Sequence, residues 1–543
     1  MAAPSVPTWD YVVFVGLTAL SLGAGLYLSL RRRSRFRSKD ETFLGSRTIG
    51  TLPLAVSMVA SNVTASGLIA FTAHYYAYGF HTLWAIPVFA PAVLMVAYLF
   101  LPVLYELKIT SVFEYLRMRY GNGVGVASSV IYFVLSQAIG VTGLYCAAVA
   151  MSTVFPVSTV ATTVIIGVTG TVYTALGGLR SVVWADCVQT LIMAASPLVI
   201  IAKIAYDSSG RSAPASNLEK LDVRAYIFRT DIDLTTDETV WAASVAAFPY
   251  QLLRLGLDQM ITQRFLAARS LPEARMVTFI GAGLLSFFYA IGGLTALTLV
   301  FWFRDCDPVL SGSISRYDQF CISLYSAASG PFAGIMILAF LFPWANARGT
   351  AMAALAVFLI QTWQTTGRFL SRIEAVRMIY SVESCPFNST LREEPSGTLE
   401  ASEGFLLYRL SSYWCCLLSA CSTVLLGLVL SLLIGGPADS LRNAARLSTP
   451  VMLKFWQRIA LLQHLQKENG HVTVIDPCFK VPPLELQHLQ EKGGDPCVPV
   501  DATKEGGVIY KFTPLGNVIR KPRKNGRQKD IVSGLRPSMG AGV

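Results

Sequence analysis

Residues 58–70, with the sequence MVASNVTASGLIA, place small polar side chains in the middle of an apolar segment. Asn62, Thr64 and Ser66 are poor helix formers, because their side chains compete for backbone hydrogen bonds. Where a membrane helix unwinds, its carbonyl oxygens can bind a cation and its half-helix ends can bind a substrate. The pattern therefore favours a broken helix that binds ions and solutes. Close helix packing through small residues is the alternative interpretation.

A second interruption is predicted in the apolar segment 239–257, which contains the sequence AAFPYQLLRLG. Pro249 removes one backbone donor there, and Arg254 and Asp258 follow near the cytoplasmic end of the segment. Two interrupted helices in corresponding positions of two halves are typical of a transporter site. Half-helix N-termini at such breaks present partial positive charge, which favours a substrate carboxylate.

The amino-acid composition indicates the class of protein in which these residues lie. The chain has 543 residues, of which 53% are hydrophobic and 14% are charged, whereas soluble domains carry nearer a quarter charged residues. It is therefore predicted to be a polytopic membrane protein without enzymatic activity. The ten cysteines form no C-x-x-C pair, so neither a zinc site nor a disulfide framework is indicated.

Eleven apolar segments are long enough, or nearly so, to cross the ~30 Å hydrocarbon core of a membrane. They run over residues 9–30, 51–74, 82–105, 124–153, 157–176, 181–205, 239–257, 277–303, 320–342, 349–363 and 407–434. The first segment is too long for a signal peptide and has its positive charge on the wrong side, so it is predicted to be retained.

The charges of the connecting segments predict the orientation. The link after the first segment carries seven Lys and Arg residues, which places it in the cytoplasm and the N-terminus, residues 1–8, outside. Alternation then places the loop 364–406 outside, where Asn388 begins the glycosylation sequon NST. The tail, 435–543, becomes cytoplasmic and is strongly basic. A solvated or lipid-facing tail is favoured there over one that binds nucleic acid.

Several motifs resemble those of the sodium:solute symporter family. They are FLGSR at 43–47, ITSVFEYLRMRYG at 109–121, YTALGGLRSVVWADCVQT at 173–190 and DQMITQRFLAARS at 258–270. DCDPVLSGSISRYDQ at 305–319 and LLYRLSSYW at 406–414 are most similar to the branch that carries monocarboxylates, iodide and vitamins such as biotin and pantothenate.

The resemblance implies an all-α, LeuT-like fold with two inverted five-helix repeats, and it implies roles for individual residues. Sodium would bind the backbone carbonyls of Ala60 and Val63, and Asn62, Thr64 and Ser66 would face the substrate. Asp186 resembles the family's acidic residue on the sodium exit path; an acid capping a helix end is the alternative. Ala185 precedes it where the family usually has Thr, so one hydroxyl is absent here.

The resemblance also predicts the domain boundaries and a gap. The expected parts are a leading helix at 9–30, a first repeat at 51–205, a second repeat at 239–348 and extra helices at 349–434. In the family a serine-rich helix that contributes to sodium binding, and a further helix, follow the SRYDQ loop. Both are missing here, and the join lies near residues 319–324. The second repeat is therefore predicted to be incomplete, through a real variant or an incomplete chain.

The function implied is a plasma-membrane, sodium-coupled symporter that imports a small organic anion by alternating access. The anion would be a monocarboxylate or a vitamin such as biotin or pantothenate, and sodium would be co-transported. A non-transporting variant that regulates or retains an intact symporter is the first alternative. A sodium symporter for another solute, such as iodide or a sugar, is the second.

Overall fold

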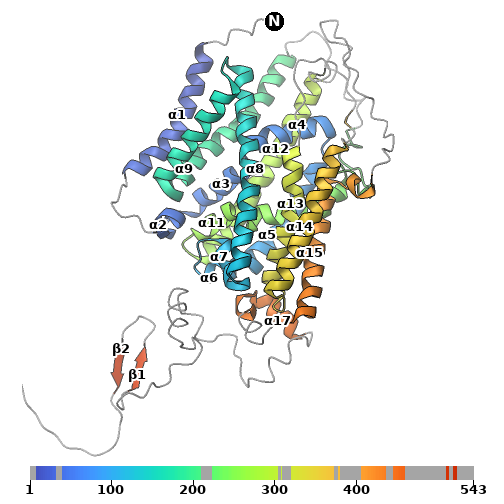
Figure 1. Ribbon diagram of the computed structural model, residues 1–543. Coiled ribbons are helices and arrows are strands. Elements are labelled where there is room, and N and C mark those ends of the chain that lie inside the picture. The colour runs from blue at the N-terminus through green and yellow to red at the C-terminus, as the bar shows by residue number, and fades with distance from the viewer. Residues whose placement is uncertain are drawn as a thin grey trace, which may run out of the picture. The chain divides into compact units, whose positions relative to one another are not determined.

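The computed structural model describes residues 8–31, 39–209, 223–303, 307, 320–371, 377–378, 405–435, 444–458, 509–512 and 518–521. The chain divides into two compact units, Met1–Gln463 and His464–Val543. The first unit contains the helices and the second contains a two-stranded antiparallel ribbon (Figure 1). In that ribbon β1 (Ile509–Phe512) pairs with β2 (Val518–Lys521).

The described helices of the first half begin with the leading helix and end with a long kinked helix. They are α1 (Thr8–Arg31), α2 (Lys39–Leu44), α3 (Thr51–Asn62), α4 (Ala65–Tyr78), α5 (Ala85–Met95), α6 (Leu101–Glu106), α7 (Val112–Tyr120), α8 (Asn122–Val154) and α9 (Thr159–Ser209). Short 3-10 turns lie at Gly45–Arg47 and His81–Trp84, and a π-helical turn, η3 (Val96–Phe100), joins α5 to α6.

The described helices of the second half are α10 (Phe248–Leu252), α11 (Gln259–Leu266), α12 (Leu271–Phe303), α13 (Phe320–Leu341), α14 (Ala347–Leu370), α15 (Ser412–Ile434) and α17 (Pro450–Arg458). Two π-helical turns, η5 (Ala242–Ala246) and η6 (Leu253–Leu257), flank α10, and a 3-10 turn, η7 (Leu406–Arg409), precedes α15. The segment around Pro249 is thus distorted on both sides but is not unwound.

Each of the eleven predicted spans coincides with a helical segment among the described residues. Five of these helices are long and apolar enough to cross a membrane by themselves, and the bent pair α3/α4 makes a sixth candidate. The other segments are shorter or interrupted. In α9 the predicted link GGLR shrinks to a kink at Gly178, whose φ of 62° favours glycine.

Helices that are distant in sequence pack side by side in the bundle. α1 packs against α9, and α3 packs against both α9 and α12 (Figure 1). α13, α14 and α15, which run from yellow to orange in Figure 1, form one packed group. A Cβ at Gly330 of α13 would lie 1.9 Å from Ser419 Oγ on α15, so the glycine permits this close approach.

The predicted end of the tenth span is wrong. The helix predicted over 349–363 continues to Leu370, so the loop predicted over 364–406 begins later. Polar residues at the end of α14 find partners in η7: Gln364 Nε2 donates to the carbonyl of Leu407 at 3.0 Å. These contacts satisfy side chains that otherwise disfavour a helix in an apolar setting. Asn388 lies outside the described residues.

Candidate functional site

The polar stretch of the second span forms a break between two helices, as predicted. α3 ends at Asn62, α4 begins at Ala65, and the two axes differ by 72°. Thr64 has an extended backbone and caps α4, because its Oγ1 accepts a hydrogen bond from Gly67 N at 3.3 Å. The last carbonyls of α3 and the first amides of α4 therefore lie on the two sides of a break at Val63 and Thr64.

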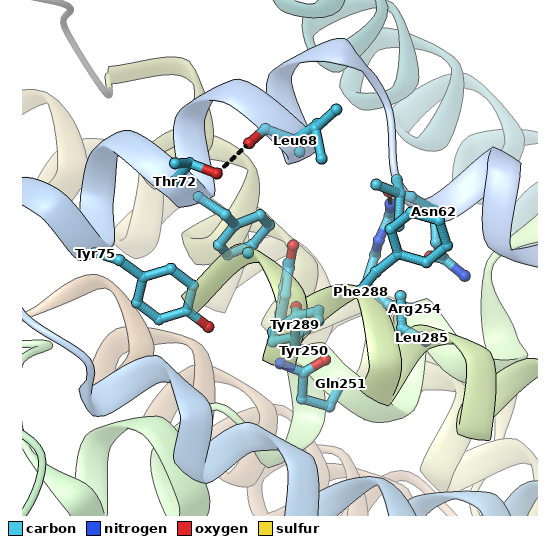
Figure 2. Close-up of a pocket in the computed structure, with 14 residues that line it drawn as sticks. Asn62, Leu68, Thr72, Tyr75, Tyr250, Gln251, Arg254, Leu285, Phe288 and Tyr289 are labelled. Carbon is cyan, nitrogen blue, oxygen red and sulfur yellow. Dashed lines mark hydrogen bonds between the residues drawn. The ribbon is translucent and has the colours of Figure 1, made fainter. Parts of the chain in front are cut away.

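A cavity of about 50 Å³ lies beside this break. Its walls come from the end of α3, from α4, from α10 and η6, and from α12. The lining residues are Asn62, Val63, Gly67, Leu68, Phe71, Thr72, Tyr75, Tyr250, Gln251, Arg254, Leu285, Phe288, Tyr289 and Gly292. Figure 2 shows Asn62, Phe288 and Arg254 at one end of the cavity and Thr72 and Tyr75 at the other.

The predicted binding residues take different positions around this cavity. Asn62 and Val63 line it, whereas Ala60 lies on α3 and is not part of its wall. Thr64 uses its hydroxyl to cap α4 instead of lining the cavity. Ser66 belongs to α4, but its side chain lies outside the described residues.

A buried cation lies at the α3 end of the cavity. Arg254 Nη2 donates to the carbonyl of Asn62 at 2.9 Å, and Nη1 lies 3.5 Å from Asp258 Oδ2. Asp258 Oδ1 accepts hydrogen bonds from Tyr132 Oη at 2.5 Å and from Met260 N at 2.9 Å. Among the described residues that line the cavity, Arg254 carries the only charge. The cavity therefore offers a guanidinium to a ligand, and the Asp258 carboxylate that pairs with it does not line the cavity.

A second buried ion pair lies nearer the start of α3. Asp186 of α9 accepts a hydrogen bond from Ser57 Oγ at 2.5 Å, and its Oδ2 lies 3.5 Å from Arg264 Nη2 of α11. Arg264 also donates to Ser57 Oγ and to the carbonyl of Met260. Asp186 lies about two turns inside the helix that follows Gly178, so it does not cap a helix end.

An acidic pair lies outside the predicted spans, just before η5, with Glu238 buried and Asp237 half-buried. The carboxylate of Asp237 accepts hydrogen bonds from the backbone nitrogens of Ser412 and Tyr413 in the first turn of α15. Burial, followed by the charge of Asp237, raises the pKa of Glu238 to about 8. The positive charge of Arg368 acts in the opposite direction. Glu238 is therefore largely protonated at neutral pH.

The motif at 58–70 did not reveal the aromatic wall of the cavity. Phe71 and Tyr75 lie one turn apart on α4 and face Tyr250 and Tyr289 from other helices. The spacing of Phe71 and Tyr75 could have suggested a shared face, since residues four apart lie on one side of a helix. Which helix that face would meet depends on packing that no local pattern encodes.

Comparisons with known proteins agree with this geometry. The model of the sodium:solute symporter family matches residues 42–342. Sodium-coupled monocarboxylate transporter 2 of Bos taurus is 30% identical over 336 residues, which cover 61% of this chain. The match covers 54% of that relative, so the chain spans about half its length.

A longer alignment exists with the sodium-dependent multivitamin transporter of Oryctolagus cuniculus, at 25% identity over 564 positions. It covers 86% of this 543-residue chain, or about 467 residues, and 88% of the relative. About 97 of its positions therefore have no counterpart in this chain. These positions are a total over the whole alignment, and two membrane helices with their links occupy a similar length of roughly a hundred residues.

A solved structure of a Na+-coupled sialic acid symporter, in a substrate-bound outward-open state, has the same fold. The TM-score is 0.58 at 17% identity, and the match covers 79% of this chain and 98% of that one. This likeness confirms the predicted all-α, LeuT-like fold class. Because the family model matches more than half of the chain, the protein belongs to the sodium:solute symporter family.

Proposed function

We propose that the chain is a sodium-coupled symporter that imports a small organic anion across the plasma membrane by alternating access. The single observation that carries the proposal is the broken helix α3/α4, whose break opens onto a cavity containing Arg254. A guanidinium binds carboxylates well, because its N–H groups match the geometry of both oxygens. The first amides of α4 add partial positive charge at the same place.

The size of the cavity favours a compact anion. A buried water needs about 10–15 Å³ in such a space, so a cavity of about 50 Å³ holds roughly three to five waters. A short monocarboxylate such as lactate fills a similar space, whereas biotin or pantothenate would require the walls to move apart. The aromatic side chains of Phe71, Tyr250 and Phe288 would cover the apolar part of such an anion.

Sodium is proposed to bind at the end of α3, through the carbonyl of Ala60 in the last turn and that of Val63, the residue that follows the helix. A helix C-terminus carries unsatisfied carbonyls and partial negative charge, which favour a cation. Asp186 contacts the middle of the same helix, through Ser57, and is proposed to contact the ion on its way to the cytoplasm. The N-terminus is proposed to be extracellular and the tail cytoplasmic.

Uptake into liposomes that contain the purified chain tests this function. An inward sodium gradient is expected to drive accumulation of radiolabelled lactate, and an equal choline gradient is not. Asn62→Leu removes the amide at the break and is expected to lower uptake about tenfold or more, since hydrogen bonds to charged groups contribute about 1.5–3 kcal/mol. Ser61→Ala is the matched control, because Ser61 bonds only within α3 to the carbonyl of Ser57 and does not line the cavity.

The second candidate is a non-transporting chain that associates with an intact symporter and regulates or retains it. The alignment positions without a counterpart here favour it, because their total is similar to the length of the two helices, with their links, that are expected after residue 319. A sodium ion needs about five or six oxygens to replace its water, and a site without the serine-rich helix provides fewer. Liposomes without any sodium-dependent uptake, together with co-purification of this chain with an intact symporter, would favour this candidate.

A further inference from the structure

We infer that Arg254 couples the binding of the organic anion to the binding of sodium. With the cavity empty of anion, the guanidinium holds the Asn62 carbonyl at the end of α3. A substrate carboxylate that binds the guanidinium neutralises it and draws it from this carbonyl, which then becomes available to a sodium ion. This inference rests on the proposed function, and it assigns to one residue the dependence of sodium binding on substrate.

Arg254 contacts two different acceptors, the backbone carbonyl of Asn62 and the carboxylate of Asp258. Nη2 lies 2.9 Å from the Asn62 carbonyl oxygen, and Nη1 lies 3.5 Å from Asp258 Oδ2. The side chain of Arg254 is 11% exposed, so solvent screens its charge little. The guanidinium borders the cavity beside Asn62 (Figure 2). An anion that enters the cavity therefore meets the same group that holds the helix end.

A buried acceptor at the break is suited to a cation. Asn62 Oδ1 is buried, and among the described residues no group donates a hydrogen bond to it. Its amide nitrogen is used, since Nδ2 donates to the carbonyl of Met58 at 3.3 Å. A buried acceptor without a partner is costly, and a sodium ion at the end of α3 would satisfy it. The Asn62 side chain is thus assigned to the ion site as well as to the cavity wall.

Repulsion explains why the two ligands must bind together. A sodium ion at the Asn62 oxygens would lie within a few ångströms of the guanidinium, in a buried site where like charges repel strongly. Asp258 carries one negative charge, which balances Arg254, so a sodium ion adds a positive charge that the pair does not compensate. A substrate carboxylate adds the second negative charge, so each ligand strengthens the binding of the other. This coupling is reciprocal by thermodynamic necessity.

Thermal unfolding of the purified full chain measures the coupling without transport. The melting temperature is followed against sodium chloride, with choline chloride holding the ionic strength constant, in the absence and presence of saturating lactate. A ligand that binds the folded state stabilises it by RT ln(1 + [L]/Kd), so the sodium concentration at half-saturation follows from the rise of the melting temperature with sodium concentration. In the natural chain, lactate is expected to lower the half-saturating sodium concentration by about tenfold, within the usual range of coupling between sites.

The decisive variant removes both charges, Arg254→Met with Asp258→Asn. Removing Arg254 alone would leave the buried carboxylate of Asp258 without an opposite charge, whereas the double change leaves no buried charge at this place. Asn at position 258 can still cap α11. The double variant is expected to bind sodium in the absence of lactate, with less than about a twofold change when lactate is added. Arg275→Met is the matched control, because Arg275 bonds to the Ala97 carbonyl away from the cavity.

Each outcome supports or overturns the inference. A tenfold effect of lactate in the natural chain and in Arg275→Met, lost in the double variant, supports it. A double variant that keeps the full effect overturns it, as does a natural chain that binds sodium and lactate independently. If the double variant does not fold, Arg254→Gln with Asp258→Asn removes the same two charges with a side chain that keeps hydrogen-bond donors, and retention of the full effect there overturns the inference. Absence of stabilisation by either ligand, together with no uptake, would instead overturn the proposed symport itself.

Discussion

The pair formed by Asp186 and Arg264 allows a quantitative test of how the first repeat is held to α11. Arg264 Nη2 lies 3.5 Å from Asp186 Oδ2, and the two side chains are only 8% and 10% exposed. Ser57 Oγ lies between them, since it donates to Asp186 and accepts from Arg264 Nε. Three helices, α3, α9 and α11, therefore depend on one charged contact. Replacing either partner leaves the other charge buried without compensation.

The size of the effect follows from the geometry. Coulomb's law with an effective dielectric constant of about 20 gives an attraction of about 5 kcal/mol at 3.5 Å. Loss of one partner of a buried pair costs about 3–5 kcal/mol. We expect Arg264→Met and Asp186→Asn each to lower the free energy of unfolding by about 3–5 kcal/mol. The double variant should lose far less than the sum of these values, because no uncompensated charge remains.

Equilibrium unfolding in mixed micelles, with all four chains compared in one double-mutant cycle, measures this coupling. Far-ultraviolet circular dichroism follows the loss of helix as denaturant is added, and the cycle isolates the pairwise term. A coupling free energy of about 3 kcal/mol is expected. A coupling below about 0.5 kcal/mol, with additive single effects, would refute the conclusion that the buried pair holds these helices together.

Three further predictions concern single residues. Glu238→Gln should flatten the pH dependence of stability. The pKa of Glu238 in the folded protein, about 8, exceeds the ordinary glutamate value of 4.5, so its contribution is complete below about pH 4.5 and is lost as the pH rises through 8. Melting temperatures at pH 5.5 and 8.5 measure this, and an unchanged slope in the variant would contradict it. Thr64→Val removes the cap of α4 and should cost about 1 kcal/mol in chemical unfolding, whereas an unchanged midpoint would show that the hydroxyl does not stabilise the break. Gly178→Ala should lower stability by about 1–3 kcal/mol, since φ is 62° and a Cβ would lie 3.1 Å from the Thr42 carbonyl oxygen; a melting temperature equal to that of the natural chain would argue against strain at the kink.

Much of the helical arrangement could be predicted because hydrophobicity is a local property. A run of about 20 apolar residues can satisfy its backbone in a membrane only as a helix, so the eleven spans coincide with helical segments. The ends of the helices were less predictable from the sequence. α14 continues past the polar residue Gln364 because η7 supplies a carbonyl partner, which lies more than forty residues later in the chain.

The candidate site was predictable at the break and not across the cavity. Asn62 and Thr64 disfavour a continuous helix by their own chemistry, and the helix indeed ends between them. Thr64 was expected to face the substrate, but its hydroxyl is closer to an amide of its own helix, so it caps α4. The missing helix pair near residues 319–324 and the orientation of the termini stay predictions.

By itself, then, the sequence determined where the spans lie, where the second one breaks and to which family the chain belongs. Those properties depend on residue type and short-range spacing, which the chain carries along its length. Only the tertiary structure decided that Arg254 meets the carbonyl of Asn62, 192 residues earlier, and that Arg264 meets Asp186, 78 residues earlier. Such partners are chosen by the packing of helices against one another, because a buried charge is stable only where the fold brings an opposite charge or a carbonyl oxygen to it.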